Sequence, residues 1–271
     1  MKFTVLGATG FVGGYLADSL RSQGISVYTP DRHEPDWLEQ LLSKDLGHVF
    51  YCIGLTANFR QRPFDTVEAH VCLLRQILEH ANMESLTYMS STRVYENSVT
   101  TDEAALLQGI PTNPGHLYNF SKLMGESLCL ASSKKTKVVR LSNVYGEDIN
   151  SKNFLTSVLK EAALNGSVQF LTSPESSKDY ISIKEVVRFL PRIAIDGVYP
   201  LYNLATGQNT TNAEIAHGLE CEGIKTSYSN DANHWSFPKV DVTRLEMEFG
   251  LIDNTLERDL PSLLNYYRLK V

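Results

Sequence analysis

A tyrosine and a lysine four residues apart, Tyr118 and Lys122, are the residues of this chain best suited to proton chemistry. Residues at this spacing lie one above the other on a helix, so both side chains can enter one cleft. A tyrosine is a weak acid near neutral pH, because its reference pKa is about 10. A nearby ammonium group lowers that pKa and would make Tyr118 a usable proton shuttle. Taken alone, however, the pair more often belongs to a helix whose tyrosine packs in the core while the lysine reaches water.

Three glycines near the N-terminus predict a second element of the site. They follow an apolar strand at residues 2–6 and open an amphipathic helix that ends near residue 24. In this context the first glycine permits a tight turn, the second lets the backbone approach a pyrophosphate, and the third lets helix and strand pack closely. The helix N-terminus then offers N–H groups to the phosphates. The residues predicted to hold a dinucleotide here are Gly7, Gly10, Phe11, Val12 and Gly13.

Two further strand ends provide cofactor candidates. The strand at residues 25–29 is followed by Asp31 and Arg32. Asp31 suits the free ribose 2′-hydroxyl of NAD, Arg32 suits the 2′-phosphate of NADP, and either residue could instead be a solvated loop charge. A buried strand at residues 48–54 ends in Ile53 and Gly54, and such strand ends are where open parallel sheets bind ligands. Both NAD and NADP therefore stay open as cofactors.

The alternation of strands and helices predicts an α/β fold, a Rossmann-type doubly wound parallel sheet with a smaller α/β C-terminal substrate lobe. We expect residues 1–148 to form the dinucleotide-binding domain, with segments near 179–206 returning to it, and residues 149–271 to form most of the substrate lobe. Further helices are predicted at 37–42, 67–81, 154–164, 184–195, 211–219, 243–249 and 255–268, and further strands at 85–91, 137–146, 168–171, 180–183 and 201–205.

The composition excludes several classes of function. A formal net charge of -6 argues against nucleic acid or an anionic membrane as the main partner. No apolar run reaches about 18 residues, and the N-terminus enters a strand without a signal-peptide core, which predicts a cytoplasmic protein with no membrane span. The cysteines are widely spaced and form no CxxC, so neither a metal nor a redox site is expected. They are Cys52, Cys72, Cys129 and Cys221.

Several motifs in the same order resemble the extended short-chain dehydrogenases/reductases, specifically the nucleotide-sugar epimerase/dehydratase group. The resemblance covers almost the whole chain. It is carried by Gly7–Gly13, Ser90-Ser91-Thr92-Arg93-Val94-Tyr95, Tyr118 with Lys122, Arg140-Leu141-Ser142-Asn143-Val144-Tyr145-Gly146, Lys178–Val186 and Tyr202–Gly207. It implies an NAD or NADP cofactor, a nucleotide-sugar substrate, and a homodimer formed through the helix that contains Tyr118 and the helix before it.

The resemblance also implies individual roles. Ser91, Tyr118 and Lys122 would be catalytic, with Tyr118 and Lys122 also touching the cofactor. Leu141 lies on the strand that passes the nicotinamide in this family. The residues expected to contact the substrate are Thr92, Arg93, Asn143, Asn153 and Lys178, and Asn143, Asn153 and Lys178 among them would hold the diphosphate.

Departures from the family pattern narrow the chemistry. Thr92 and Arg93 stand where 4,6-dehydratases usually carry an Asp-Glu pair, and the cysteine and histidine of 3,5-epimerase/reductases are missing. Lys178 stands where an arginine is common, which keeps the charge but loses the bidentate fork. His70 stands where the family usually has an asparagine, and we expect it to be a hydrogen-bonded core residue. These features favour transfer of a hydride and one proton at one sugar carbon, with carbon 4 preferred.

Three functions remain as alternatives. The short second lobe and Arg32 favour a nucleotide-sugar 4-ketoreductase. A nucleotide-sugar 4-epimerase, which retains its cofactor and returns the hydride to the other face, fits the same residues. A non-catalytic NAD(P)-binding sensor or scaffold is the alternative from another class, but such proteins usually lose the tyrosine or the lysine, and both are present here.

Overall fold

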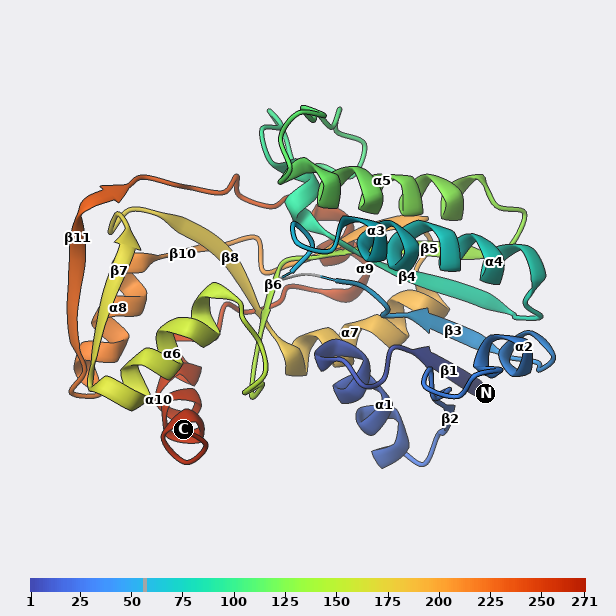
Figure 1. Ribbon diagram of the computed structural model, residues 1–271, viewed down its shortest axis with the longest axis horizontal. Helices are drawn as coiled ribbons and strands as arrows, with labels where there is room; N and C mark the ends of the chain where they lie inside the picture. Colours follow the sequence, from blue (N-terminus) through green and yellow to red (C-terminus); the bar gives the residue numbers. More distant parts are fainter. Residues whose placement is uncertain (56–57) are drawn as a thin grey trace.

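Six parallel strands form the central sheet of the computed structural model, which describes residues 1–55 and 58–271 (Figure 1). The strand order is β2-β1-β3-β4-β5-β9. Most of these strands are apolar and buried, as expected for a parallel sheet covered on both faces. This arrangement confirms the predicted Rossmann-type fold. The bounds are β1 (Lys2–Leu6), β2 (Ser26–Tyr28), β3 (His48–Tyr51), β4 (Ser85–Ser91), β5 (Thr136–Leu141) and β9 (Leu201–Leu204).

Helices cover the two faces of this sheet (Figure 1). One face packs against α1 (Phe11–Ser22) and α7 (Ile183–Asp196), whose apolar side chains form one core with β1, β3 and β5. The other face carries α3 (Pro63–Val67), α4 (Leu73–His80) and α5 (His116–Ala131). The short α2 (Trp37–Leu42) contributes the buried Leu41 to this second core. This short helix stands where a full strand-helix unit would otherwise be. In the described part of the chain, no further strand therefore follows β2 in the sheet order, and β2 forms the edge of the sheet.

Two predicted elements are interrupted in the structure. The helix expected over residues 67–81 is a series of α3, a π-helical turn η1 (Glu68–Cys72) and α4. The strand expected over residues 137–146 divides at Ser142, whose N–H donates to the Leu204 carbonyl at 3.1 Å. Beyond Ser142, β6 (Asn143–Tyr145) leaves the main sheet and pairs with a strand of the second lobe. The division carries the chain from the sheet edge toward the second lobe.

The second lobe contains two small sheets and its own apolar core (Figure 1). One sheet has the order β10-β8-β6, and the other pairs β11 with β7 in parallel. The strands β10 and β11 are not predicted from the sequence, because both are rich in polar residues and partly exposed. The remaining bounds are α6 (Phe154–Asn165), β7 (Ser167–Thr172), β8 (Ser177–Ser182), β10 (Asn209–Thr211), α8 (Asn212–Cys221), β11 (Lys225–Asn233), α9 (Thr243–Phe249) and α10 (Leu256–Arg268).

Candidate active site

The three residues predicted to be catalytic lie together where β4 meets α5. Tyr118 and Lys122 project from one face of α5, with the Lys122 Nζ 5.9 Å from the centre of the Tyr118 ring. Ser91 ends β4, and its side chain is close enough to Tyr118 to favour the phenolate. Tyr118 is only 6% exposed and Lys122 only 4%. The structure therefore brings a phenol, an ammonium group and a hydroxyl into one largely desolvated site.

The Tyr118 pKa does not follow the sequence-based expectation. Burial raises it above its ordinary value, and the groups that act to lower it are Ser91 and Arg93. The four-residue spacing predicts that Lys122 lowers this pKa. Its Nζ instead donates a hydrogen bond to the Met89 carbonyl at 2.8 Å. The cation that acts on the phenol in this structure is Arg93, whose guanidinium carbon lies 5.9 Å from the centre of the Tyr118 ring.

Burial also changes the charge state of Lys122. It lowers the pKa of this side chain to about 7, against an opposing effect of Glu126. Glu126 follows Lys122 by one helical turn and forms a buried bidentate ion pair with Arg140 of β5, at 3.0 and 2.6 Å. Sequence reasoning missed Glu126, although its spacing of four residues from Lys122 placed it on the same face of the helix. The ion pair joins α5 to β5 beneath the candidate site.

His70 is a fully buried, doubly hydrogen-bonded residue, as expected. Its Nε2 accepts the Leu55 N–H at 3.2 Å, so the ring proton lies on Nδ1, which donates to Ser121 Oγ at 2.8 Å. Ser121 in turn donates to the Tyr118 carbonyl at 2.9 Å. Burial, together with the Lys122 charge, lowers the His70 pKa to about 2. His70 is therefore neutral and joins the loop after β3 to the Tyr118 turn of α5.

The depressed His70 pKa predicts a measurable pH dependence of stability. Below the reference histidine pKa of about 6.5 the unfolded chain binds a proton that folded His70 does not, so the wild type loses stability as pH falls. Relative to His70→Asn, the wild-type free energy of unfolding should drop by up to about 1.4 kcal/mol per pH unit between pH 6.5 and 5. Urea unfolding at several pH values measures this difference. If the free energies of unfolding of the wild type and His70→Asn change with pH in parallel, the prediction is wrong. The exposed His80→Asn serves as the control.

The glycine loop after β1 has the geometry required for a close backbone turn. Gly7 has φ of +87°, and a Cβ on it would lie 2.9 Å from the carbonyl carbon of Cys52. A Cβ on Gly13 would lie 2.3 Å from the Gly7 carbonyl oxygen. Gly10 is the residue that caps α1, which begins at Phe11. The α1 N-terminus is thus turned toward the ends of β1 and β3, as dinucleotide binding requires.

A cavity of about 370 Å³ lies beside predicted cofactor residues that follow β3 and β2. Arg32, Ile53 and Gly54 all line it, and the Arg32 guanidinium carbon lies 5.7 Å from the centre of the Trp37 ring. Asp31 accepts the His33 N–H at 2.9 Å. Leu141 is opposite Ser91 in the sheet register. The glycine turn and this cavity together fit a dinucleotide.

The predicted substrate residues are distributed between the main sheet and the second lobe. The Lys178 Nζ lies over two aromatic rings of that lobe, 4.7 Å from the centre of Phe154 and 4.9 Å from that of Trp235. Burial lowers the Lys178 pKa, and the charge of Arg93 lowers it further. Thr92 is buried beside Arg93.

The two predicted asparagines already have hydrogen bonds within the protein. The Asn143 Nδ2 donates to the Asp179 carbonyl at 2.8 Å, which leaves its side-chain oxygen for a ligand. The Asn153 Oδ1 caps α6 by accepting the Thr156 N–H at 2.8 Å, which leaves its amide donors. Both asparagines therefore keep hydrogen-bonding capacity for a ligand, because an amide nitrogen has two N–H donors and an amide oxygen has two lone pairs.

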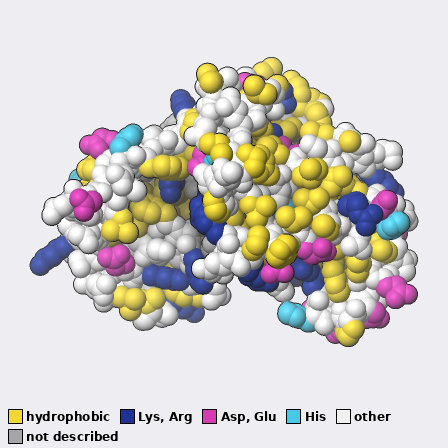
Figure 2. All heavy atoms as spheres, turned by 45° about the horizontal axis from the view of Figure 1, so that its top comes forward, with side chains coloured by type: hydrophobic (Ala, Val, Ile, Leu, Met, Phe, Trp, Pro, Cys, Tyr) yellow, Lys and Arg dark blue, Asp and Glu magenta, His cyan; other side chains and the backbone are white. Residues whose placement is uncertain are grey.

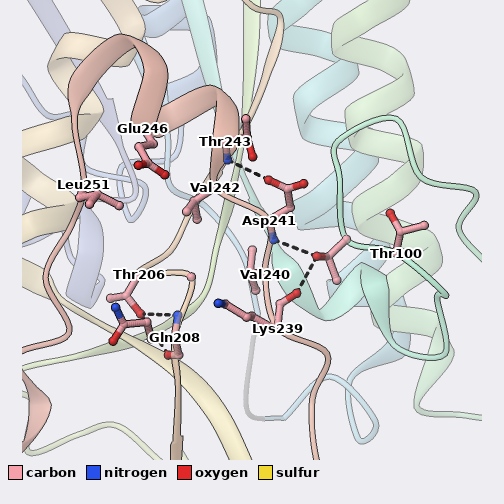
Figure 3. Close-up of a pocket in the computed structure, with 12 residues that line it drawn as sticks. Thr100, Thr206, Gln208, Lys239, Val240, Asp241, Val242, Thr243, Glu246 and Leu251 are labelled. Atoms are coloured by element: carbon pink, nitrogen blue, oxygen red, sulfur yellow. Dashed lines mark hydrogen bonds between the residues drawn. The ribbon is translucent and has the colours of Figure 1, made fainter.

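A second cavity, of about 510 Å³, lies away from Tyr118 between the loop at residues 100–101, residues 206–208 and α9 (Figure 3). Its polar groups bond to one another: Thr101 Oγ1 donates to the Lys239 carbonyl at 2.7 Å and accepts the Asp241 N–H at 2.8 Å. None of the predicted site residues lines it. We assign the chemistry to the Tyr118 site.

Within residues 1–55 and 58–271, no three His, Cys, Asp or Glu side chains gather in a way that could hold a metal ion. In the same part of the chain, no helix combines the length and apolar character needed to cross a bilayer.

Comparison with known proteins decides the family. Residues 3–205 match the model of the NAD dependent epimerase/dehydratase family. This chain belongs to that family. The family's dependence on NAD confirms the predicted nicotinamide dinucleotide, and the predicted resemblance is confirmed with it.

Solved structures and curated proteins extend this comparison. MoeE5 in complex with UDP-glucuronic acid and NAD superposes over 100% of both chains, with a TM-score of 0.82 and 22% identity. RMD from Pseudomonas aeruginosa, complexed with NADPH, covers 100% of this chain and 99% of its own, with a TM-score of 0.82 and 22% identity. An uncharacterized membrane protein of Methanocaldococcus jannaschii is 25% identical over 184 residues, 65% of this chain and 50% of that protein. The chain spans about half the length of the curated relatives it matches.

Proposed function

We propose that this protein is an NAD(P)-dependent oxidoreductase that acts on one carbon of a nucleotide-activated sugar, most simply as a 4-ketoreductase. The observation that carries the proposal is the convergence of Ser91, Tyr118 and Lys122 at one desolvated point, where a Cβ on Gly54 would lie 3.4 Å from the Lys122 Nζ. The nucleotide-sugar ligands and the NAD or NADPH of MoeE5 and RMD support the substrate class and the cofactor.

Each residue would have a defined task. Tyr118 donates the proton to the oxygen of the reacting carbon or removes it, and Ser91 donates a hydrogen bond to the same oxygen as charge develops there. Lys122 in its charged form favours the Tyr118 phenolate and reaches the nicotinamide ribose. The nicotinamide, when bound, supplies or accepts the hydride. Gly7, Gly10 and Gly13 hold the pyrophosphate, and the cavity that contains Arg32 takes the adenosine.

The substrate would lie across the hollow between the main sheet and the second lobe. Figure 2 shows Lys and Arg side chains along this hollow. Lys178 would bind the diphosphate, with the free ends of the Asn143 and Asn153 amides beside it. Binding at this distance from the reacting carbon helps to position that carbon against Tyr118.

The reductase and the 4-epimerase are distinguished by cofactor stoichiometry. We favour the reductase because Arg32 lines the adenosine cavity, where its guanidinium suits the 2′-phosphate of NADP. Absorbance of reduced nicotinamide should fall in step with product when 4-keto nucleotide sugars of the UDP, GDP, CDP and dTDP series are supplied with NADPH or NADH. Turnover of a nucleotide sugar without net change in that absorbance would show an epimerase instead.

We also propose a homodimer formed through α5 and the helices beside it. Figure 2 shows hydrophobic side chains gathered over this face of the molecule. Phe120 and Met124 are one turn apart on α5 and are 36% and 54% exposed, and Phe64 of α3 is 88% exposed. A contiguous apolar surface of this kind is typical of an interface. Light scattering of the purified protein tests the proposal.

A further inference from the structure

Two arginines, Arg60 and Arg93, converge beside Tyr118, and the proposed function assigns neither of them a ligand. A Cβ built on Gly115, the residue before α5, would lie 3.3 Å from Arg60 Nη2 and 3.7 Å from Arg93 Nη2. The two guanidinium groups thus both lie close to Gly115. Phe59 is buried between them, with its ring centre 4.6 Å from the Arg60 guanidinium carbon and 5.4 Å from that of Arg93.

The charge around these arginines is poorly balanced within the part of the chain that the structure describes. Glu96 is the acid paired with Arg93, at 3.5 Å, and it also accepts a hydrogen bond from Asn119. Arg60 forms no ion pair with a described residue. The Arg93 Nε is buried and has no hydrogen-bond partner among the described residues. A buried cationic donor without a partner is costly, so the Arg93 Nε, with the exposed Arg60 guanidinium near it, fits a ligand that is itself anionic.

The position of Arg93 indicates which part of the ligand carries that charge. Its guanidinium lies against the Tyr118 ring and so within reach of a substituent on the carbon next to the reacting one. Lys178 lies over rings of the second lobe and is better placed for the diphosphate. Arginine presents a planar fork of donors that matches a carboxylate.

We propose that the substrate sugar is a uronate, and that Arg93, assisted by Arg60, selects its carboxylate. The inference rests on the proposed function and adds the substrate class to it. A neutral hexose would leave the Arg93 Nε without a hydrogen-bond partner and Arg60 without an anionic one among the described residues, whereas a uronate carboxylate would offer acceptors to both. Arg93 is then a specificity residue as well as a cation beside the catalytic phenol.

Binding constants for matched ligands test this proposal. Isothermal titration of the full chain with NAD bound, in a Tyr118→Phe background that prevents turnover, would compare UDP-glucuronate, UDP-glucose and UDP. GDP-mannuronate and GDP-mannose provide the same comparison with another base. The uronate of the accepted nucleotide should bind at least about tenfold tighter than its neutral hexose, as a charge-assisted bidentate contact requires. Arg93→Gln should abolish that preference and leave the hexose and UDP within about threefold.

Two control variants separate the sources of charge. Lys178→Met should weaken UDP, hexose and uronate alike, and Arg192→Gln, on the exposed side of α7, should change none of them. If Arg93→Gln weakens all three ligands by the same factor, Arg93 binds the diphosphate and the inference is wrong. Equal binding of uronate and hexose by the unmodified site would also overturn it, while the proposed function would stand. Failure of every nucleotide sugar to bind would instead overturn the proposed function.

Discussion

Replacement of Tyr118 by phenylalanine is expected to lower kcat by about a hundredfold to ten-thousandfold, the range of general acid-base catalysis. The change removes the one oxygen that can exchange a proton with the reacting carbon's oxygen. It keeps the ring that packs on Phe59 and His70, with ring centres 5.2 and 5.4 Å away. The fold and the binding of NAD(P) should therefore be preserved. Steady-state rates, together with fluorescence titration of the reduced cofactor, measure both properties.

A matched variant shows whether the loss is specific to this hydroxyl. Tyr267 of α10 is also a buried tyrosine, and its hydroxyl donates to the Asp148 carbonyl at 3.1 Å in the second lobe. Tyr267→Phe should cost stability but leave kcat close to that of the wild type. If Tyr118→Phe retains all biological activity and cofactor binding, the protein is a dinucleotide-binding sensor or scaffold, and the proposed reaction is wrong.

The parts of the site that the sequence predicted are those set by local spacing. Tyr118 and Lys122 share a helix face because they are four residues apart, and Gly7 to Gly13 form a turn because they separate a strand from a helix. Ser91 reaches Tyr118 because β4 ends at the carboxyl edge of the sheet. Each relation follows from one element or from the general rule that parallel strands end at the same edge.

Relations that depend on packing between distant segments were not predictable in this way. Arg60 and Arg93 meet at Gly115 only because residues distant in the sequence pack beside the start of α5. One indication of a role for Arg60 is present in the sequence, because this residue follows the end of a predicted strand. The polar strands β10 and β11 form because their partners supply the apolar layer, so their own sequences show little periodicity. The pKa of Lys122 depends on how completely the site excludes water, which spacing does not determine.

That exclusion of water leads to a second large expected effect, in the variant Lys122→Met. Loss of the ammonium group should lower kcat/KM at least about a hundredfold, because the phenol loses its partner and the nicotinamide ribose loses a donor. The same change should relieve the protein of a buried charge. Folded Lys122 has a pKa of about 7, and an unfolded lysine has one of about 10.4.

The sign of this stability effect depends on pH. Between pH 7 and about 10 the unfolded chain binds a proton that folded Lys122 does not, so wild-type stability rises with pH in this window. Below pH 7 the folded protein carries the full cost of the buried ammonium. The free energy of unfolding of Lys122→Met minus that of the wild type should therefore be greatest at or below pH 7. It should shrink by up to about 1.4 kcal/mol per pH unit above it.

Urea unfolding without cofactor at pH 6.5, 8 and 9.5 measures this difference, and exposed Lys225→Met serves as the control for activity. Loss of the Lys122 hydrogen bond to the Met89 carbonyl costs about 1–3 kcal/mol, but that cost does not vary with pH and leaves the slope unchanged. A pH-independent difference would show that Lys122 is charged in the folded protein throughout this range, because its ammonium group is then as well stabilised as in water. The slope of this difference against pH thus measures how strongly the site disfavours the charged form of Lys122. That in turn determines how much the charged Lys122 can influence Tyr118.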